Sequence, residues 1–416
     1  MNNFYSQSEY YVKRWVSSLL KQSLEDFPVL VLTGARQVGK STLLLNEEPF
    51  DKFRYLTLDD FDVLRQSQEH PEDLWAGTEH IVLDEVQKAP NLITAIKQNV
   101  DKTNGKIKFV LSGSANLLLM KQISESLAGR AIYHVLDPLT LGEINGTQPI
   151  NLLNQILMGK WPKEEIVSPP PDIVPILQRG MMPTLLRFSS ESSYSKWWGG
   201  YVATYLERDL RQISQIDSLV DFRHLMELLA LRTGQLLNQS DLARDAGLSQ
   251  PTTHRYLNLL ETTHLFDRLP AFTSNRTTRL LKSPKAFWVD SGLASYLSGY
   301  YQVEGLREAR ELGNLFEAFI YHHIRVLAGL LSPAARIYHW RTVPGHEVDF
   351  VLEYGRKILA FEVKLTKKPS YHDANGLRKF LGDHPQSVGG IILHGGSDIR
   401  RLGENIMAFP WTMITG

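Results

Sequence analysis

One short segment near the amino terminus restricts the fold more than any other part of this sequence. Residues 34–41 read Gly-Ala-Arg-Gln-Val-Gly-Lys-Ser, which is the G-x-x-x-x-G-K-[ST] spacing of a phosphate-binding loop. An apolar run at 29–32 predicts a buried strand before the loop, and residues 42–45 predict a helix after it. Backbone amides of such a loop surround a phosphate, and the helix amino terminus adds partial positive charge. A glycine-rich turn without a ligand is the alternative.

The residues of this loop have separate expected tasks. We expect Lys40 to reach the β- and γ-phosphates of a nucleotide, and the Ser41 hydroxyl to bind Mg²⁺. The expected nucleotide-binding residues are Gly34, Ala35, Arg36, Gln37, Val38, Gly39, Lys40, Ser41 and Thr42.

Two acidic residues follow a second apolar strand. Residues 80–83 read His-Ile-Val-Leu and lead into Asp84 and Glu85, while residues 54–58 predict another strand. Continuous apolar strands of this kind are typical of a parallel sheet that is covered on both faces. We expect Asp84 to hold magnesium through water and Glu85 to polarise the water that attacks the γ-phosphate. A solvated acidic pair at the end of a strand is the alternative.

Three further polar residues are candidates for the same site. Residues 107–112 predict a strand that ends in small hydroxyl residues, and either Ser112 or Ser114 could sense the γ-phosphate. Arg130 precedes a predicted strand at 131–136 and is a candidate arginine finger, which would act from a neighbouring subunit of a homo-oligomer. The alternatives are an ordinary turn without a functional role at the serines, and an arginine that pairs with a local carboxylate.

The composition excludes several classes of protein. The 416 residues include no cysteine, so disulfides and thiolate-bound zinc are excluded and a reducing compartment is allowed. No apolar run reaches the length of a membrane span and no signal peptide begins the chain, so we expect a cytoplasmic protein. Lys plus Arg and Asp plus Glu both number 45, which argues against general coating of nucleic acid but allows a local basic patch.

Four segments together resemble the AAA-type ATPase domain of a large prokaryotic family. They are residues 34–41, Asp84-Glu85-Val86-Gln87-Lys88-Ala89-Pro90, Ser112-Gly113-Ser114, and Leu127-Ala128-Gly129-Arg130 followed by Pro138-Leu139. In that family the ATPase domain precedes a poorly characterised region called DUF4143, and the resemblance covers nearly the whole chain. It implies a parallel sheet in the order 5-1-4-3-2, binding of ATP with Mg²⁺, and ATP hydrolysis.

The middle of the chain predicts a linker and a possible DNA-binding module. The cluster Ser168-Pro169-Pro170-Pro171 breaks regular structure, and the region before it would be the remnant of an ATPase lid, in which no second sensor arginine is identified. A helix-turn-helix pattern with a wing is spread over residues 240–246, 247–249, 250–260 and 265–272. Thr252, Thr253 and Arg255 would point outward, where base contacts arise in such domains. A winged helix that only contacts proteins is the alternative.

Two strands near the carboxyl terminus carry charges where a buried sheet should be apolar. Residues 348–353 and 358–364 predict a hairpin, and alternation places Val348, Phe350 and Leu352 on one face. Glu362 and Lys364 then share the opposite face of their strand, and Asp349 points away from the apolar face of its own. Burial of such charges is costly unless they serve a purpose.

This hairpin resembles the metal site of PD-(D/E)XK nucleases. The resemblance implies that Asp349 and Glu362 hold Mg²⁺, that Lys364 orients or activates water, and that Glu317 completes the site. An inert nuclease-like fold, kept for dimerisation or for holding DNA, is the alternative. His322, His323 and His346 are expected to be core or surface histidines and not metal ligands.

Together these patterns predict an α/β protein of four parts. They are an AAA+ ATPase domain at 1–150, a lid remnant and linker at 151–215, a winged helix-turn-helix domain at 216–285, and a PD-(D/E)XK nuclease-like α/β domain at 286–416. The expected function is ATP hydrolysis by a protein that acts on or with DNA, its nuclease-like domain being active or vestigial. The alternative is an ATP-dependent regulatory switch whose C-terminal region binds a protein partner.

Overall fold

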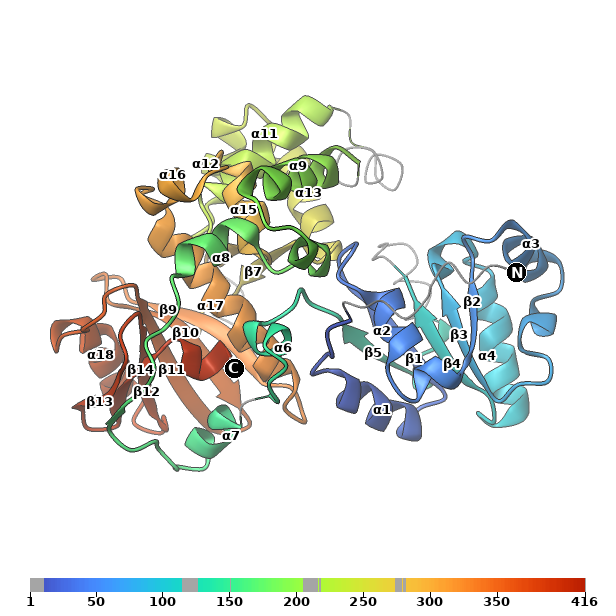
Figure 1. The fold of residues 1–416 in the computed structure, drawn as a ribbon, viewed down its shortest axis with the longest axis horizontal. Coiled ribbons are helices and arrows are strands. Elements are labelled where there is room, and N and C mark those ends of the chain that lie inside the picture. Colours follow the sequence, from blue (N-terminus) through green and yellow to red (C-terminus); the bar gives the residue numbers. More distant parts are fainter. Residues whose placement is uncertain are drawn as a thin grey trace. The chain divides into compact units, whose positions relative to one another are not determined.

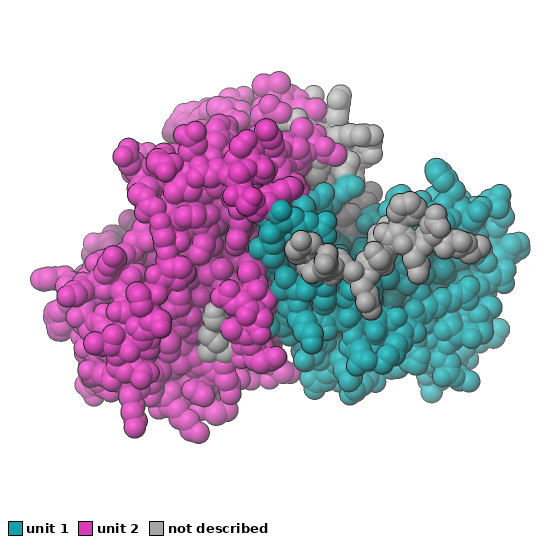
Figure 2. Space-filling model, viewed as in Figure 1, with its two compact units in different colours: residues 1–139, 182–187, 262–265 teal, residues 140–181, 188–261, 266–416 magenta. Residues whose placement is uncertain are grey.

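The chain folds into two compact units, which Figure 2 colours separately. Unit 1 comprises residues 1–139, 182–187 and 262–265, and unit 2 comprises residues 140–181, 188–261 and 266–416. The computed structural model describes residues 11–113, 126–149, 151–204, 216, 218–273, 279 and 282–415. Within these ranges, every helix is too short or too polar to cross a membrane.

Unit 1 is built on a five-stranded parallel sheet (Figure 1). The strands lie in the order β2-β3-β4-β1-β5, which confirms the expected order. The strand bounds are β1 Val29–Thr33, β2 Arg54–Thr57, β3 His80–Asp84, β4 Lys108–Ser112 and β5 Ala131–Val135. The helices and 3₁₀ turns are α1 Ser17–Asp26, α2 Lys40–Asn46, η1 Phe50–Lys52, α3 Phe61–Glu69, η2 Pro71–Trp75, η3 Val86–Lys88, α4 Leu92–Thr103 and η4 Pro183–Arg187.

The packing of this sheet explains why its strands are continuously apolar. Val31, Leu83 and Phe109 pack on one face together with Ile96 of α4 and Trp75 of η2. Every residue of β1 is buried, as expected for a parallel strand that is covered on both faces. Parallel strands bring their carboxyl ends to one edge of the sheet, so the loop after β1 and the acidic end of β3 meet there.

The middle of unit 2 contains the predicted helix-turn-helix segments. The helices are α11 Leu219–Ala230, α12 Gln239–Asp245 and α13 Gln250–Thr262, followed by the antiparallel strands β7 Phe266–Leu269 and β8 Lys285–Trp288. Thr253 does not point outward as expected, because it shares the buried face of α13 with Leu257, four residues later. Its hydroxyl donates to the Ser249 carbonyl at 3.1 Å.

The carboxyl-terminal part of unit 2 is a seven-stranded mixed sheet in the order β6-β13-β14-β12-β11-β10-β9. The bounds are β6 Glu165–Ile166, β9 Arg336–Arg341, β10 Glu347–Tyr354, β11 Lys357–Lys364, β12 Gly389–His394, β13 Asp398–Gly403 and β14 Ile406–Pro410. The helices of unit 2 outside its middle are α6 Leu141–Ile144, α7 Leu152–Leu157, α8 Ile173–Arg179, α9 Glu191–Tyr201, α15 Ser291–Leu297, α16 Val303–Arg307, α17 Leu312–Gly329, η6 His372–Ala374, α18 Asn375–Asp383 and α19 Thr412–Thr415. The hairpin β10–β11 is antiparallel, as the sequence predicts.

A β-bulge in β10 changes which of its side chains share a face. The pairing of β10 with β9 shifts register between Val348 and Val351. Val348 packs in the same core cluster as Val351, whereas Phe350 pairs with Phe361 of β11. The expectation that Val348 and Phe350 share a face is therefore wrong, since one extra residue interrupts the alternation. Asp349 lies within this bulge.

Candidate functional site

The phosphate loop forms the turn between β1 and α2 that the sequence predicts. Gly34 has a φ of 147°, and a Cβ there would lie 2.3 Å from the carbonyl oxygen of Leu136. Gly39 immediately precedes α2 and has a φ of 96°. Both positions therefore need glycine. The free N–H groups at the start of α2 lie at the end of this loop, where they can donate to an anion.

Lys40 is buried, and its ammonium donates to carbonyl oxygens of its own loop. Its Nζ donates to the carbonyl oxygens of Gly34 at 3.0 Å and Ala35 at 2.9 Å. Burial lowers the pKa of the Lys40 ammonium to about 8, although the carboxylates of Glu85 and Asp84 oppose this shift. These two carboxylates do not fully offset the cost of burial, so an anionic ligand such as a phosphate would stabilise the Lys40 ammonium.

Ser41 and Asp84 meet at the carboxyl edge of the sheet. The Ser41 hydroxyl donates to Asp84 Oδ2 at 2.6 Å, and the Tyr55 hydroxyl donates to the same oxygen at 2.5 Å. A hydroxyl and a carboxylate so close together are hard oxygen ligands of the kind that Mg²⁺ prefers. The pair therefore fits the expected metal. Sequence reasoning missed Tyr55, because a tyrosine inside a strand carries no motif signal.

Glu85 follows β3 in a left-handed conformation, with a φ of 58°. Its backbone N–H donates to Asp84 Oδ1 at 3.0 Å, which holds the two acidic residues in a fixed relation. Burial raises the pKa of Glu85, and the neighbouring Asp84 carboxylate raises it further. A carboxyl group with a raised pKa is a better proton acceptor than an ordinary surface glutamate.

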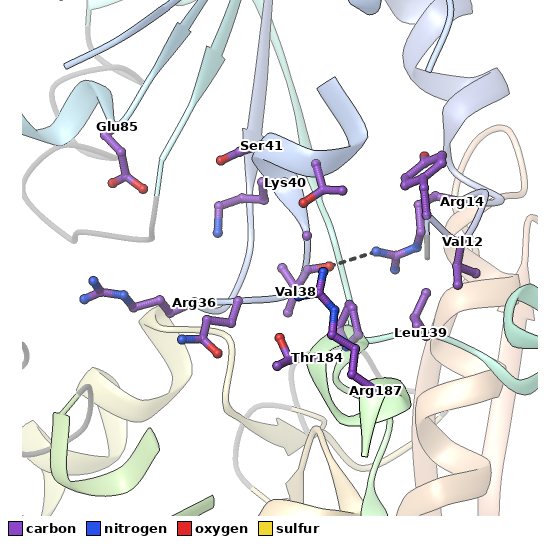
Figure 3. Close-up of a pocket in the computed structure, with 15 residues that line it drawn as sticks. Val12, Arg14, Arg36, Val38, Lys40, Ser41, Glu85, Leu139, Thr184 and Arg187 are labelled. Atoms are coloured by element: carbon purple, nitrogen blue, oxygen red, sulfur yellow. Dashed lines mark hydrogen bonds between the residues drawn. The ribbon is translucent and has the colours of Figure 1, made fainter. Parts of the chain in front are cut away.

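An open pocket of about 340 Å³ lies against the phosphate loop. Figure 3 shows Lys40, Ser41 and Glu85 around this pocket, together with arginines that the sequence did not single out. Arg14 Nη1 donates to the Val38 carbonyl at 2.9 Å, and Arg187 extends from η4 toward the loop (Figure 3). Arg187 falls within 151–215, where no second sensor arginine was identified. The fold alone brings both arginines to the loop, since neither stands near it in the sequence.

Comparison with known families agrees with this geometry. Residues 26–145 match the family model of an AAA domain, and residues 312–414 match that of DUF4143, a domain of unknown function. The chain carries an AAA domain followed by a DUF4143 domain. Residues 171–304, between these two matches, match a second domain of unknown function, DUF8612.

The relatives that match most of this chain are themselves uncharacterized. A protein of Mycobacterium tuberculosis is 29% identical over 400 residues, which cover 96% of this chain and 83% of the relative. A protein of Haemophilus influenzae is 21% identical over 387 residues, which cover 88% of this chain and 89% of the relative. Among solved structures, a Walker-type ATPase of Pyrococcus abyssi is 18% identical with a TM-score of 0.43, and the match covers 71% of this chain and 96% of that one.

Ser112 lies close to the phosphate loop of the AAA domain. It is the last residue of β4 and pairs with Leu32 of β1, two residues before the loop begins. Ser112 is buried, and its hydroxyl has no hydrogen-bond partner within the described ranges. Ser114, the other candidate, lies outside the described residues. The position of Ser112 at the loop edge is compatible with sensing a phosphate.

Arg130 lies at the other end of the AAA sheet from the loop. It immediately precedes β5, whose first residue pairs with Val29 at the start of β1, whereas the loop follows the end of β1. Its Nε is 2.5 Å from Asp101 Oδ1, and its Nη1 donates to the Ala128 carbonyl at 3.1 Å. The local carboxylate named as the alternative is therefore present, and Arg130 does not reach the loop of its own chain.

Three predicted carboxylates form what we call the acidic cluster of unit 2, namely Glu317 of α17, Asp349 of β10 and Glu362 of β11. A fourth residue, Lys285 of β8, places its Nζ 2.8 Å from Glu317 Oε1 and 3.2 Å from Asp349 Oδ1. Asp349 Oδ2 accepts the Val363 N–H at 2.8 Å. Lys364 Nζ lies 2.7 Å from Glu362 Oε1, so these two side chains share a face of β11 as expected.

As it stands, the acidic cluster does not fit a divalent cation. The Lys285 ammonium lies between two of the three carboxylates, and within the described ranges no three His, Asp or Glu side chains are arranged to hold a metal. Of the predicted Mg²⁺ ligands, Asp349 and Glu317 thus contact an internal cation, and Glu362 pairs with Lys364. Lys285 was missed because it stands in the predicted winged helix, one residue before the expected nuclease-like domain.

Burial dominates the electrostatics of the acidic cluster. It raises the pKa of Glu317 to about 8, with a further contribution from Asp349. It also raises the pKa of Glu362 well above its ordinary value, again with help from Asp349. His323 of the same helix as Glu317 accepts the Leu141 N–H at 3.1 Å through Nε2 and is fully buried, which is a structural contact.

Proposed function

We propose that the chain binds ATP with Mg²⁺ at the pocket of unit 1 and hydrolyses it. The observation that carries this proposal is the buried Lys40 ammonium, which donates to two carbonyls of the loop, beside the Ser41–Asp84 pair and Glu85. A triphosphate supplies the negative charge that this arrangement lacks. The match of residues 26–145 to an AAA domain supports the same conclusion.

Each residue then has a definite task in the reaction. The amides at the start of α2 bind phosphate oxygens, and Lys40 exchanges its carbonyl acceptors for the β- and γ-phosphates. Ser41 and Asp84 would hold Mg²⁺, which would supply positive charge to the transferring phosphoryl group. Glu85 accepts a proton from the attacking water, which its raised pKa favours.

The variant Glu85→Gln tests the assignment of the base. Because an amide cannot accept the proton, we expect turnover to fall by about 100-fold or more while binding of ATP remains. Steady-state hydrolysis and equilibrium binding of ATP, measured on the same preparation, separate the two steps. Glu79→Gln, a surface residue that faces Lys106, is the matched control. Full turnover by the Glu85 variant contradicts the proposal.

We also propose that Arg130 acts on the nucleotide of a neighbouring copy in a homo-oligomer, since it does not reach its own loop. Mixing inactive Lys40→Met subunits with inactive Arg130→Ala subunits tests this idea. Each mixed interface can combine an intact loop with an intact Arg130, so we expect turnover to reappear in the mixture. A mixture as inactive as its parts contradicts action between subunits.

For unit 2, the position of Lys285 favours the second candidate function, an ATP-dependent switch whose C-terminal region binds a partner without cutting DNA. We expect the wild-type chain with Mg²⁺ or Mn²⁺ to leave linear and circular DNA intact. Cleavage that disappears in Asp349→Asn would establish the nuclease instead. DNA retention at low and high salt then tests whether DNA is the partner, because phosphate contacts weaken steeply as salt rises.

A further inference from the structure

Gln87 stands two residues after the proposed base and contacts it directly. The 3₁₀ turn η3 begins right after Glu85, and its Lys88 N–H donates to the Glu85 carbonyl at 3.0 Å. This turn folds the Gln87 side chain back toward Glu85, and Gln87 Nε2 donates to Glu85 Oε2.

The residue after β4 contacts the same Gln87 side chain. A Cβ built on Gly113 would lie only 2.3 Å from Gln87 Oε1. The Gln87 amide therefore rests directly against the Cα of Gly113, which follows Ser112. No side chain larger than hydrogen fits at 113 unless the amide moves. Gln87 thus spans the space between the proposed base and the strand whose end lies beside the phosphate loop.

We propose that Gln87 is a positioning residue for Glu85, and that Gly113 is glycine so that Gln87 can reach it. The inference rests on the proposed function, in which Glu85 accepts a proton from the attacking water. A glutamate side chain has several rotatable bonds, and fixing them for the reaction costs entropy. A charge-assisted hydrogen bond to one oxygen fixes the carboxylate plane and leaves the other oxygen for water.

The position of Glu85 makes such support necessary. Its backbone is left-handed, a conformation that a non-glycine residue adopts only when its surroundings hold it there. The Asp84 carboxylate anchors the Glu85 N–H, and the η3 turn anchors its carbonyl. Gln87 is the contact that extends this anchoring from the backbone to the carboxylate itself.

Removal of the Gln87 amide group gives the first test. In Gln87→Met, which keeps the length of the side chain but cannot donate, we expect kcat to fall about 10- to 100-fold because the base is misplaced. The KM for ATP and the equilibrium Kd for ATP should stay within about twofold, since Gln87 does not line the pocket. A rise in KM or Kd with unchanged kcat overturns the inference.

A double-mutant cycle with Gly113 gives the sharper test. Gly113→Ala alone should lower kcat about as much as Gln87→Ala, because the new Cβ displaces the amide. In the double variant the shortened side chain no longer meets that Cβ, so we expect no further loss beyond Gln87→Ala. Losses that multiply would mean independent effects and would overturn the inference.

Glu85→Gln in the same assays separates this inference from the proposed function. If Glu85→Gln keeps full turnover, the assigned base is wrong and the inference fails with it. If Glu85→Gln abolishes turnover while Gln87→Met behaves as wild type, only the inference fails. If both lower kcat, adding Gln87→Met to Glu85→Gln should cause no further loss, because no base remains to be positioned.

Discussion

Lys40 of unit 1 and Lys285 of unit 2 are both buried, with 7% and 4% of their surface exposed, yet their surroundings differ. Lys40 donates to two carbonyls, and burial lowers its pKa to about 8. For Lys285, burial alone would also lower the pKa, but attraction to Glu317 and Asp349 outweighs it and raises the pKa. Lys40 contacts only carbonyls among the described residues, whereas Lys285 contacts two carboxyl groups. The same residue type therefore indicates a ligand site in one unit and an internal ion pair in the other.

The comparison predicts opposite consequences for removing each ammonium, and the largest effect belongs to Lys40. In Lys40→Met we expect ATP turnover to fall by about 100-fold or more, since a preorganised cation at the transferring phosphate is lost. The same variant should unfold at the same denaturant concentration as wild type or a higher one, because burial of the Lys40 ammonium costs more than the nearby Glu85 and Asp84 carboxylates offset. ATP hydrolysis and denaturant unfolding measure the two effects.

A matched control for Lys40 is available on the surface of unit 1. Lys52 pairs with Glu48 in an exposed ion pair, and Lys52→Met should leave turnover unchanged. If Lys40→Met instead destabilises the chain and retains turnover, the two lysines are alike and the comparison fails.

The second effect in size concerns the stability of unit 2. Lys285→Met leaves the Glu317 and Asp349 carboxylates buried without their cation, so we expect a loss of about 3–5 kcal/mol in the free energy of unfolding. The shift of the denaturant midpoint measures it. Lys379→Met is the matched control in the same unit, because Lys379 and Asp383 of α18 form an exposed ion pair that should contribute less than about 1 kcal/mol.

The measured shifts also bear on the metal question. If Lys285→Met is as stable as wild type and gains binding of Mn²⁺ that Asp349→Asn removes, the ammonium was standing where a cation belongs. If Lys285→Met is as stable as wild type and does not bind Mn²⁺, the buried carboxylates do not require a cation for stability. Only a clear loss of stability supports the view that Lys285 is a permanent partner of the cluster.

The two sites also differ in how far the sequence alone could predict them. The phosphate loop is contiguous, and its glycines, Lys40 and Ser41 act through local backbone geometry, so their spacing carries the information. Asp84 and Glu85 follow from a parallel sheet, because its strands end at a common edge. The contacts of Arg14, Arg187 and Tyr55 depend on how distant segments pack, and no local pattern records that.

In unit 2 the sequence predicted the hairpin but not the surroundings of its charges. Alternation failed at Val348, because a β-bulge inserts one residue and no residue type marks the insertion. Lys285 reaches the acidic cluster from β8, and it precedes Asp349 by 64 positions in the sequence. A motif search confined to the hairpin therefore finds the carboxylates and misses the cation that neutralises them.

The smallest expected effect is a pH dependence that only Lys40 should produce. Its folded pKa of about 8 lies below the ordinary value of 10.5, so the unfolded chain binds more protons between these values. The contribution of Lys40 to the free energy of unfolding therefore rises as pH increases from about 8 to about 10.5. ATP binding changes in the opposite direction, since it uses the ammonium that is lost, and the Kd of a non-hydrolysable ATP analogue should increase a few-fold between about pH 7.5 and 9. Lys40→Arg keeps its charge over this range, so its Kd should stay flat. An equal rise in both proteins would assign the effect to another group and remove this distinction between Lys40 and Lys285.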